Sequence, residues 1–173
     1  MTFKVKAVLI VLMTISSFFS SADSELFKAA RSGNDSKILE LLAQGSNIDE
    51  RDKLEWTPLF EAISWGKIDT AKLLIENNSS INLVNNEGNT PLHMAAFLGH
   101  TELVRLLVEK GADIEAKNNN AQTALFYASA GKYEITEFLL KQGAKQTADK
   151  FGNTPIKHTT SDETKALLKS YQK

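Results

Sequence analysis

The side chains that could carry acid–base or metal chemistry in this chain are few. Its 173 residues contain three histidines, His93, His100 and His158, and no cysteine. A histidine can serve as a general base or a metal ligand, but the chain has no His-Glu-x-x-His, no Gly-x-Ser-x-Gly and no phosphate-binding glycine-rich loop. The lack of cysteine excludes disulfides, thiolate metal sites and a cysteine nucleophile. We therefore predict no enzyme activity, no cofactor and no metal.

The overall composition is that of an ordinary soluble globular protein. Apolar residues make up 42% of the chain and charged residues 24%. With 20 basic and 21 acidic residues the net charge is −1, which gives no bulk attraction for nucleic acid or an anionic membrane. We therefore expect no nucleic-acid partner, and no membrane partner once the N-terminal segment has been removed.

Residues 1–22 have the layout of a secretory signal peptide. A basic start with Lys4 and Lys6 precedes a mostly apolar run over residues 7–19, and the small residues Ser20 and Ala22 favour cleavage after Ala22. The alternative is an uncleaved membrane anchor, but the run is shorter than the roughly 20 residues that span a bilayer. We therefore predict an exported protein of the periplasm or the medium, untethered because it has no lipid-accepting cysteine.

The rest of the chain is periodic. Each proline lies in a Thr-Pro-Leu or Thr-Pro-Ile motif, and a fourth copy, Thr-Ala-Leu, lacks the proline. The threonines of the four motifs are Thr57, Thr90, Thr123 and Thr154. Their spacings are 33, 33 and 31 residues, and glycine pairs 12 residues apart follow the same period. Such a fixed period indicates a stacked array.

Each unit predicts two short helices. A threonine hydroxyl can cap free backbone N–H groups, proline suits the first helical turn, and glycine ends a helix. In the third unit these signals predict a helix over residues 91–98 and a second over about 101–110. In the second unit Asn78 stands where the others have glycine, and asparagine also tolerates the left-handed conformation. Two short helices cannot bury their own apolar faces, so neighbouring units must cover one another.

The third unit, from Asn86 to His100 and from Gly111 to Ile114, closely resembles the ankyrin repeat, and the resemblance covers roughly residues 24–173. It implies an all-α solenoid of stacked helix-turn-helix units with β-hairpin-like fingers. It also implies structural roles for His93 and His100. The distance from threonine to glycine is nine residues in the third unit and eight in the fourth, which predicts that the first helix of the fourth unit is one residue shorter. The predicted units are an N-terminal capping repeat at 24–51, repeats at 52–84, 85–117 and 118–148, and a C-terminal capping repeat at 149–173.

The resemblance also implies where a partner would bind. Family members contact partners through finger residues just before the Thr-Pro pair and through exposed positions near the end of the first helix. The corresponding residues are Leu54, Trp56, Trp65, Asn86, Glu87, Asn89, Phe97, Leu98, Asn119, Asn120, Gln122, Tyr127 and Phe151. The large apolar members suggest an exposed strip of the kind that anchors partners. The alternative is that some of them pack against neighbouring fingers.

We therefore predict a monomeric, non-catalytic module that binds another exported protein through its fingers and concave face, as an inhibitor, protector or scaffold. One alternative is an effector that acts on a protein of a foreign cell. Another is an enzyme or a small-ligand-binding protein with its site in the concave groove, for which the sequence contains no motif.

Overall fold

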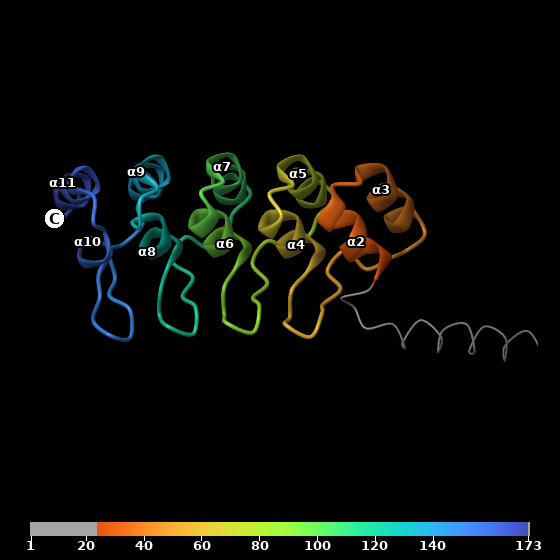
Figure 1. The fold of residues 1–173 in the computed structure, drawn as a ribbon, viewed down its shortest axis with the longest axis horizontal. Coiled ribbons are helices and arrows are strands. Elements are labelled where there is room, and N and C mark those ends of the chain that lie inside the picture. The colour runs from red at the N-terminus through yellow and green to blue at the C-terminus, as the bar shows by residue number, and fades with distance from the viewer. Residues whose placement is uncertain (1–23, 173) are drawn as a thin grey trace, which may run out of the picture.

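The structure is a computed structural model that describes residues 24–172, and the predicted signal peptide lies outside the described residues. Within 24–172 all regular structure is helical, which confirms the predicted all-α class. The helices form five pairs in a row (Figure 1). Their bounds are α2 Glu25–Ser32, α3 Asp35–Ala43, α4 Pro58–Ser64, α5 Ile68–Glu76, α6 Pro91–Leu98, α7 Thr101–Glu109, α8 Ala124–Ala128, α9 Tyr133–Lys141, α10 Pro155–His158 and α11 Asp162–Ser170.

The pairs stack in two rows. The first helices α2, α4, α6, α8 and α10 pack side by side, and the second helices α5, α7, α9 and α11 do the same. The loops that join one pair to the next project from the side of the first helices (Figure 1). We call these loops fingers; they span residues 44–57, 77–90, 110–123 and 142–154. The array is the solenoid that the period predicted.

Hydroxyl side chains begin most of the first helices. The hydroxyls of Thr57, Thr90 and Thr123 each accept a hydrogen bond from the backbone N–H three residues later, and Ser24 does the same for α2. The exception is Thr154, whose buried hydroxyl has no partner and whose helix α10 has four residues. The predicted Thr-Pro helix starts are confirmed, but at the last one the hydroxyl does not cap the helix.

Residues with a left-handed backbone follow most of the helices, but not α10 or α11. All nine glycines have positive φ, and Asn78 follows the end of α5 with a φ of 66°. The left-handed conformation predicted for Asn78 is therefore confirmed. Among the helices of residues 24–172 the longest has nine residues, and none is long and apolar enough to cross a membrane.

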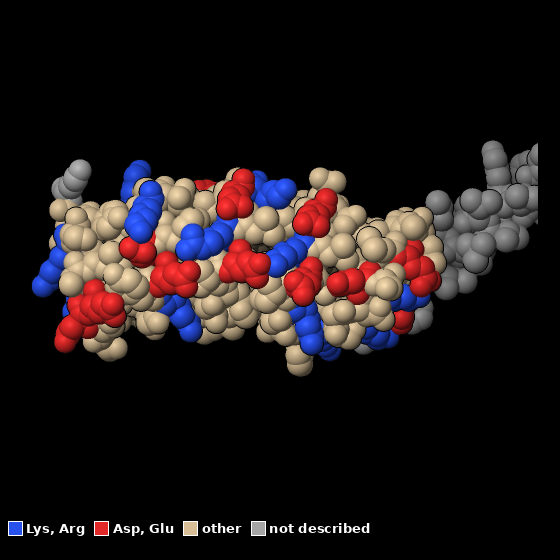
Figure 2. All heavy atoms as spheres, turned by 90° about the horizontal axis from the view of Figure 1, so that it is seen from above, with Lys and Arg blue, Asp and Glu red and all other residues tan. Residues whose placement is uncertain are grey.

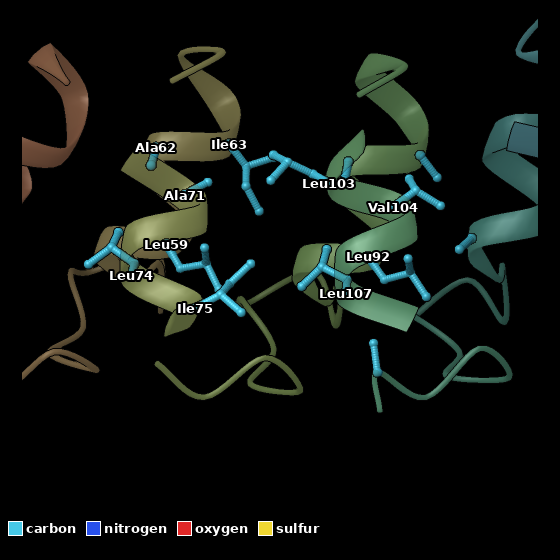
Figure 3. Packing of buried hydrophobic residues seen from close by; sticks show 14 of the residues in the cluster. Leu59, Ala62, Ile63, Ala71, Leu74, Ile75, Leu92, Leu103, Val104 and Leu107 are labelled. Atoms are coloured by element: carbon cyan, nitrogen blue, oxygen red, sulfur yellow. The ribbon is translucent and has the colours of Figure 1, made fainter. Parts of the chain in front are cut away.

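The core lies between the two rows and between consecutive pairs. Leucines and isoleucines from both helices of a pair are completely buried against the next pair, as Figure 3 shows for α4–α5 and α6–α7. Examples are Leu59, Ile63, Leu74, Leu103 and Leu107, all 0% exposed. Each such side chain contributes about 1.5–3 kcal/mol by leaving water. Stability therefore comes from contacts between units as much as from contacts within them.

Helix α8 is shorter than the sequence indicated. It has five residues, against eight in α6, although the motif spacing predicted a loss of only one. The hydroxyl of Ser129 donates to the carbonyl of Phe126 at 2.7 Å, and such a side-chain bond competes with continuation of the helix. Tyr127 is nevertheless the next-to-last residue of α8, as Phe97 is of α6, so it still lies at the end of its helix.

Candidate functional site

The four fingers share one turn, built by a side-chain oxygen. The Oδ1 atom of Asn85 accepts backbone N–H bonds from Glu87 at 3.0 Å and Asn89 at 2.9 Å. Asp52, Asn118 and Asp149 make the same two bonds in their own fingers. Burial raises the pKa of Asp149, but the hydrogen bonds from Asn153 and Phe151 outweigh that effect and hold the pKa below its usual value. These four residues were not among the predicted site residues, although they recur with the period of the threonines.

Adjacent fingers are tied together at their tips. Backbone N–H groups of Asn86 and Asn119 donate to the carbonyls of Leu54 and Glu87 in the preceding finger, at 3.1 and 3.0 Å. Lys150 N–H donates in the same way to the carbonyl of Asn120 at 3.0 Å. The tips therefore form one continuous hydrogen-bonded edge, so the residues that they carry are held in place before any partner arrives.

The predicted apolar strip is exposed in part. Trp65, Phe97 and Phe151 are 56%, 56% and 70% exposed, and Leu54 in the first finger is 51% exposed. Trp56 is half-buried, with its ring centroid 6.0 Å from that of Phe60. Leu98 is also half-buried and packs on the hydrophobic core. Trp56 and Leu98 therefore pack against helical residues, and not against a neighbouring finger, while the other side chains remain accessible.

The polar residues predicted to meet a partner divide by exposure. Asn86, Glu87 and Asn119 are exposed, whereas Asn120, Gln122 and Tyr127 are half-buried. Asn89 differs from the expectation of an exposed finger residue, because it is only 7% exposed. Its Oδ1 accepts from Asn118 Nδ2 at 2.8 Å and its Nδ2 donates to Glu87 Oε2 at 3.0 Å. It therefore joins two fingers instead of facing solvent.

Four of the predicted residues meet at one cavity. Its volume is about 170 Å³, and its walls are Glu87, Asn89, His93, Met94, Phe97 and Tyr127. The rings of Phe97 and Tyr127 meet edge to face with centroids 5.7 Å apart. The Tyr127 hydroxyl accepts from Asn118 Nδ2 at 2.9 Å, and burial raises the pKa of this tyrosine. The cavity thus combines two aromatic walls with one carboxylate.

The histidines at the expected structural positions hold the repeats together. His93 is buried; its Nδ1 accepts from the Thr90 N–H at 3.1 Å, which assigns the proton to Nε2, and Nε2 donates to the Gln122 carbonyl at 3.0 Å. Burial lowers the pKa of His93, so the ring is neutral near pH 7. His100 Nε2 lies 3.1 Å from the Ile63 carbonyl. Within residues 24–172, no group of three or more histidines and carboxylates could hold a metal ion.

A second aromatic site lies nearer the N-terminus. The guanidinium of Arg31 pairs with the Glu61 carboxylate, and its central carbon lies 5.6 Å from the centre of the Trp65 ring. Trp65 Nε1 donates to the same carboxylate at 3.2 Å. A cation is therefore held here between a carboxylate and an aromatic ring, all from this chain.

The opposite side of the molecule has a different character. Figure 2 shows basic and acidic side chains alternating over the second helices. Ion pairs bridge consecutive helices there, from Lys72 to Glu102 and from Arg105 to Glu134. Among residues 24–172, the exposed aromatic side chains of the second helices and their ends are Tyr133 and Tyr171, which are 37% and 40% exposed and thus less accessible than Trp65 or Phe97. A partner that needs apolar anchors would therefore meet the first helices and fingers.

Models of known protein families match most of the described residues. A family model described as ankyrin repeats in three copies matches residues 26–118, and a single ankyrin repeat model matches residues 120–150. No curated protein matches the chain.

Proposed function

Because the chain belongs to the ankyrin repeat family, whose repeats are generic protein–protein interaction modules, we propose that it is a non-catalytic protein that binds a partner protein. The partner would contact the fingers and the exposed ends of the first helices, which we call the binding face. The observation that carries this proposal is the accessibility of Trp65, Phe97 and Phe151 on that face. Large aromatic side chains in such positions are typical anchors of protein interfaces.

The geometry of the fingers supports the same proposal. Their tips are joined by backbone hydrogen bonds, so little conformational entropy is lost when a folded partner docks. The aromatic anchors have only two side-chain torsions each, which keeps their own ordering cost low. A surface of this kind binds without rearranging, so we expect the protein to recognise its partner as a rigid body. We expect the protein itself to be a monomer.

Affinity capture tests the proposal. The native protein is used as bait on the cell-envelope fraction, beside a variant with Trp65→Ala and Phe97→Ala. A matched control carries Leu39→Ala and Tyr133→Ala, because these exposed apolar residues lie on the second helices α3 and α9. We expect a partner that the native protein and the control retain and the Trp65/Phe97 variant loses. Equal capture by all three folded baits would refute binding through this face.

We also propose that the protein is exported and that residues 1–22 are removed, so that it works in the periplasm or the medium. The support is the order of basic, apolar and small residues in that segment. Cell fractionation followed by N-terminal sequencing of the mature protein checks this. We expect a chain that starts at Asp23; a full-length chain in the cytoplasm would contradict the proposal.

The proposed consequence of binding is inhibition, protection or scaffolding of another exported protein. Detection of the mature chain inside a foreign cell would instead favour an effector. The two roles use the same binding face and differ only in where the partner resides.

A further inference from the structure

The cavity beside the second finger is of a size for one side chain. Its volume of about 170 Å³ lies below the roughly 300–1,000 Å³ of pockets that hold small molecules. It opens between the finger residue Glu87 and the first-helix residues Met94, Phe97 and Tyr127. A side chain projecting from the surface of a partner would reach it without entering the protein interior.

The charge of the cavity favours a cation. Glu87 is exposed and its Oε2 accepts one hydrogen bond, from Asn89 Nδ2. No lysine, arginine or histidine among residues 24–172 forms an ion pair with this carboxylate. His93 on the cavity wall is neutral because burial lowers its pKa, so it does not oppose a positive charge. Glu87 thus has the capacity to bind one more donor.

The aromatic walls favour the same kind of occupant. The Phe97 ring is largely exposed, and the Tyr127 ring meets it edge to face. The face of an aromatic ring attracts a cation within about 6 Å of its centre. A flat guanidinium can stack on such a ring while its N–H groups bond to a carboxylate, which a compact ammonium does less well.

The protein already contains such an arrangement within its own chain. One unit away, the guanidinium of Arg31 lies over the Trp65 ring and bonds to the Glu61 carboxylate. In the cavity the carboxylate and the rings are present, and no guanidinium of residues 24–172 forms an ion pair there.

We propose that the cavity binds the guanidinium of an arginine side chain on the partner protein, paired with Glu87 and stacked against Phe97 and Tyr127. This inference rests on the proposed function, since the arginine belongs to the partner. It identifies the partner's contact surface as one that presents an arginine beside apolar residues that would meet Trp65 and Phe151.

The test uses a small probe and needs no partner. The isotope-labelled protein is titrated with N-acetyl-arginine methylamide and, separately, with the uncharged citrulline analogue, at matched ionic strength. We expect saturable NMR shifts of the Asn89 side-chain amide and the Glu87 backbone amide with the arginine probe. We expect the citrulline probe to bind about tenfold more weakly, because it lacks the charge-assisted hydrogen bonds.

Glu87→Gln and the control Glu109→Gln complete the design. Both remove one charge from the same repeat, but Glu109 is an exposed residue at the end of α7 on the other row. We expect Glu87→Gln to weaken the arginine probe about tenfold and Glu109→Gln to leave its affinity unchanged. Equal binding of the two probes, equal loss in both variants, or no saturable shift at Asn89 and Glu87 would overturn the inference. Failed capture of a protein partner with normal probe binding would instead count against the proposed function.

Discussion

Four fingertip residues share a left-handed backbone conformation but not a residue type. They are Glu55, Gly88, Ala121 and Gly152, each three residues after the Asp or Asn that builds the turn. Glycine adopts positive φ without strain, whereas alanine at this conformation is strained by about 1–2 kcal/mol. The sequence shows glycine at two of the four tips, so two fingers carry strain that a substitution could relieve.

We expect Ala121→Gly to stabilise the protein by up to about 1 kcal/mol, since the relieved strain exceeds the added entropy of the unfolded chain.

Gly88→Ala should destabilise the protein, and by more than Gly152→Ala does. An added Cβ at Gly88 would lie 2.7 Å from Asn119 Oδ1 and 2.8 Å from Asn119 N, whereas at Gly152 it meets nothing within 4 Å. Urea unfolding of the three variants measures these differences. A loss of stability in Ala121→Gly would contradict the assigned strain.

His93 makes stability depend on pH. Its pKa is lowered in the folded protein because it is buried, so the unfolded chain binds a proton more readily. The contribution of His93 to the free energy of unfolding is therefore complete above the pKa of this histidine in the unfolded chain, about 6.5. It is lost as pH falls from that value toward the folded pKa, by at most about 1.4 kcal/mol for each pH unit.

Urea unfolding between pH 7.5 and pH 5 checks this effect of His93. We expect the free energy of unfolding to fall on acidification, and a His93→Gln variant, although less stable at pH 7.5, to fall less steeply. A variant curve parallel to that of the native protein would show that His93 is not the titrating group.

Among the helix pairs, the last one, α10 and α11, has the shortest first helix and follows a segment with unsatisfied buried polar atoms. Helix α10 has four residues, and of these only Pro155 is buried. Three buried polar atoms in the preceding finger and helix start, on Gln146, Thr147 and Thr154, have no hydrogen-bond partner. An unsatisfied buried polar group costs about 1–3 kcal/mol. The C-terminal end of the array should therefore open most easily.

Amide hydrogen exchange measures that opening. We expect the amides of α11 to exchange faster than those of α7, although both helices have nine residues. We expect local opening of the last pair to have a lower free energy than opening of a central pair, because a central pair is covered on both sides. Uniform protection along the array would mean that it opens only as a whole.

The sequence predicted the helix ends well because capping is local. Thr57 and Asn78 act within three or four residues of the helix end that they set, so their types and spacing were sufficient. The burial of Asn89 could not be predicted in this way, because it depends on Asn118 in the next finger. The length of α8 likewise depends on the hydroxyl of Ser129, for which the motif carries no signal.

For the whole molecule, the second helices form a charged side (Figure 2), whereas Trp65, Phe97 and Phe151 are accessible on the first helices and fingers. The exposed aromatic side chains of the first helices and fingers are Trp65, Phe97 and Phe151, from three different units of the array. The sequence predicted an apolar strip on the fingers and first helices, but it did not predict the charged side. The cavity was not predicted, because its walls come from residues of two neighbouring units whose approach only the fold reveals.

The proposed binding depends on the exposed aromatic side chains of the first helices, Trp65 and Phe97. The most direct measurement is the dissociation constant of the captured partner for the native protein, the Trp65→Ala/Phe97→Ala variant and the Leu39→Ala/Tyr133→Ala control. Anchor residues of this kind contribute about 2 kcal/mol or more each. We therefore expect affinity to fall at least about 100-fold in the first variant and to stay within about threefold in the control. An unchanged affinity in the first variant, with its fold intact, would show that these side chains do not hold the partner.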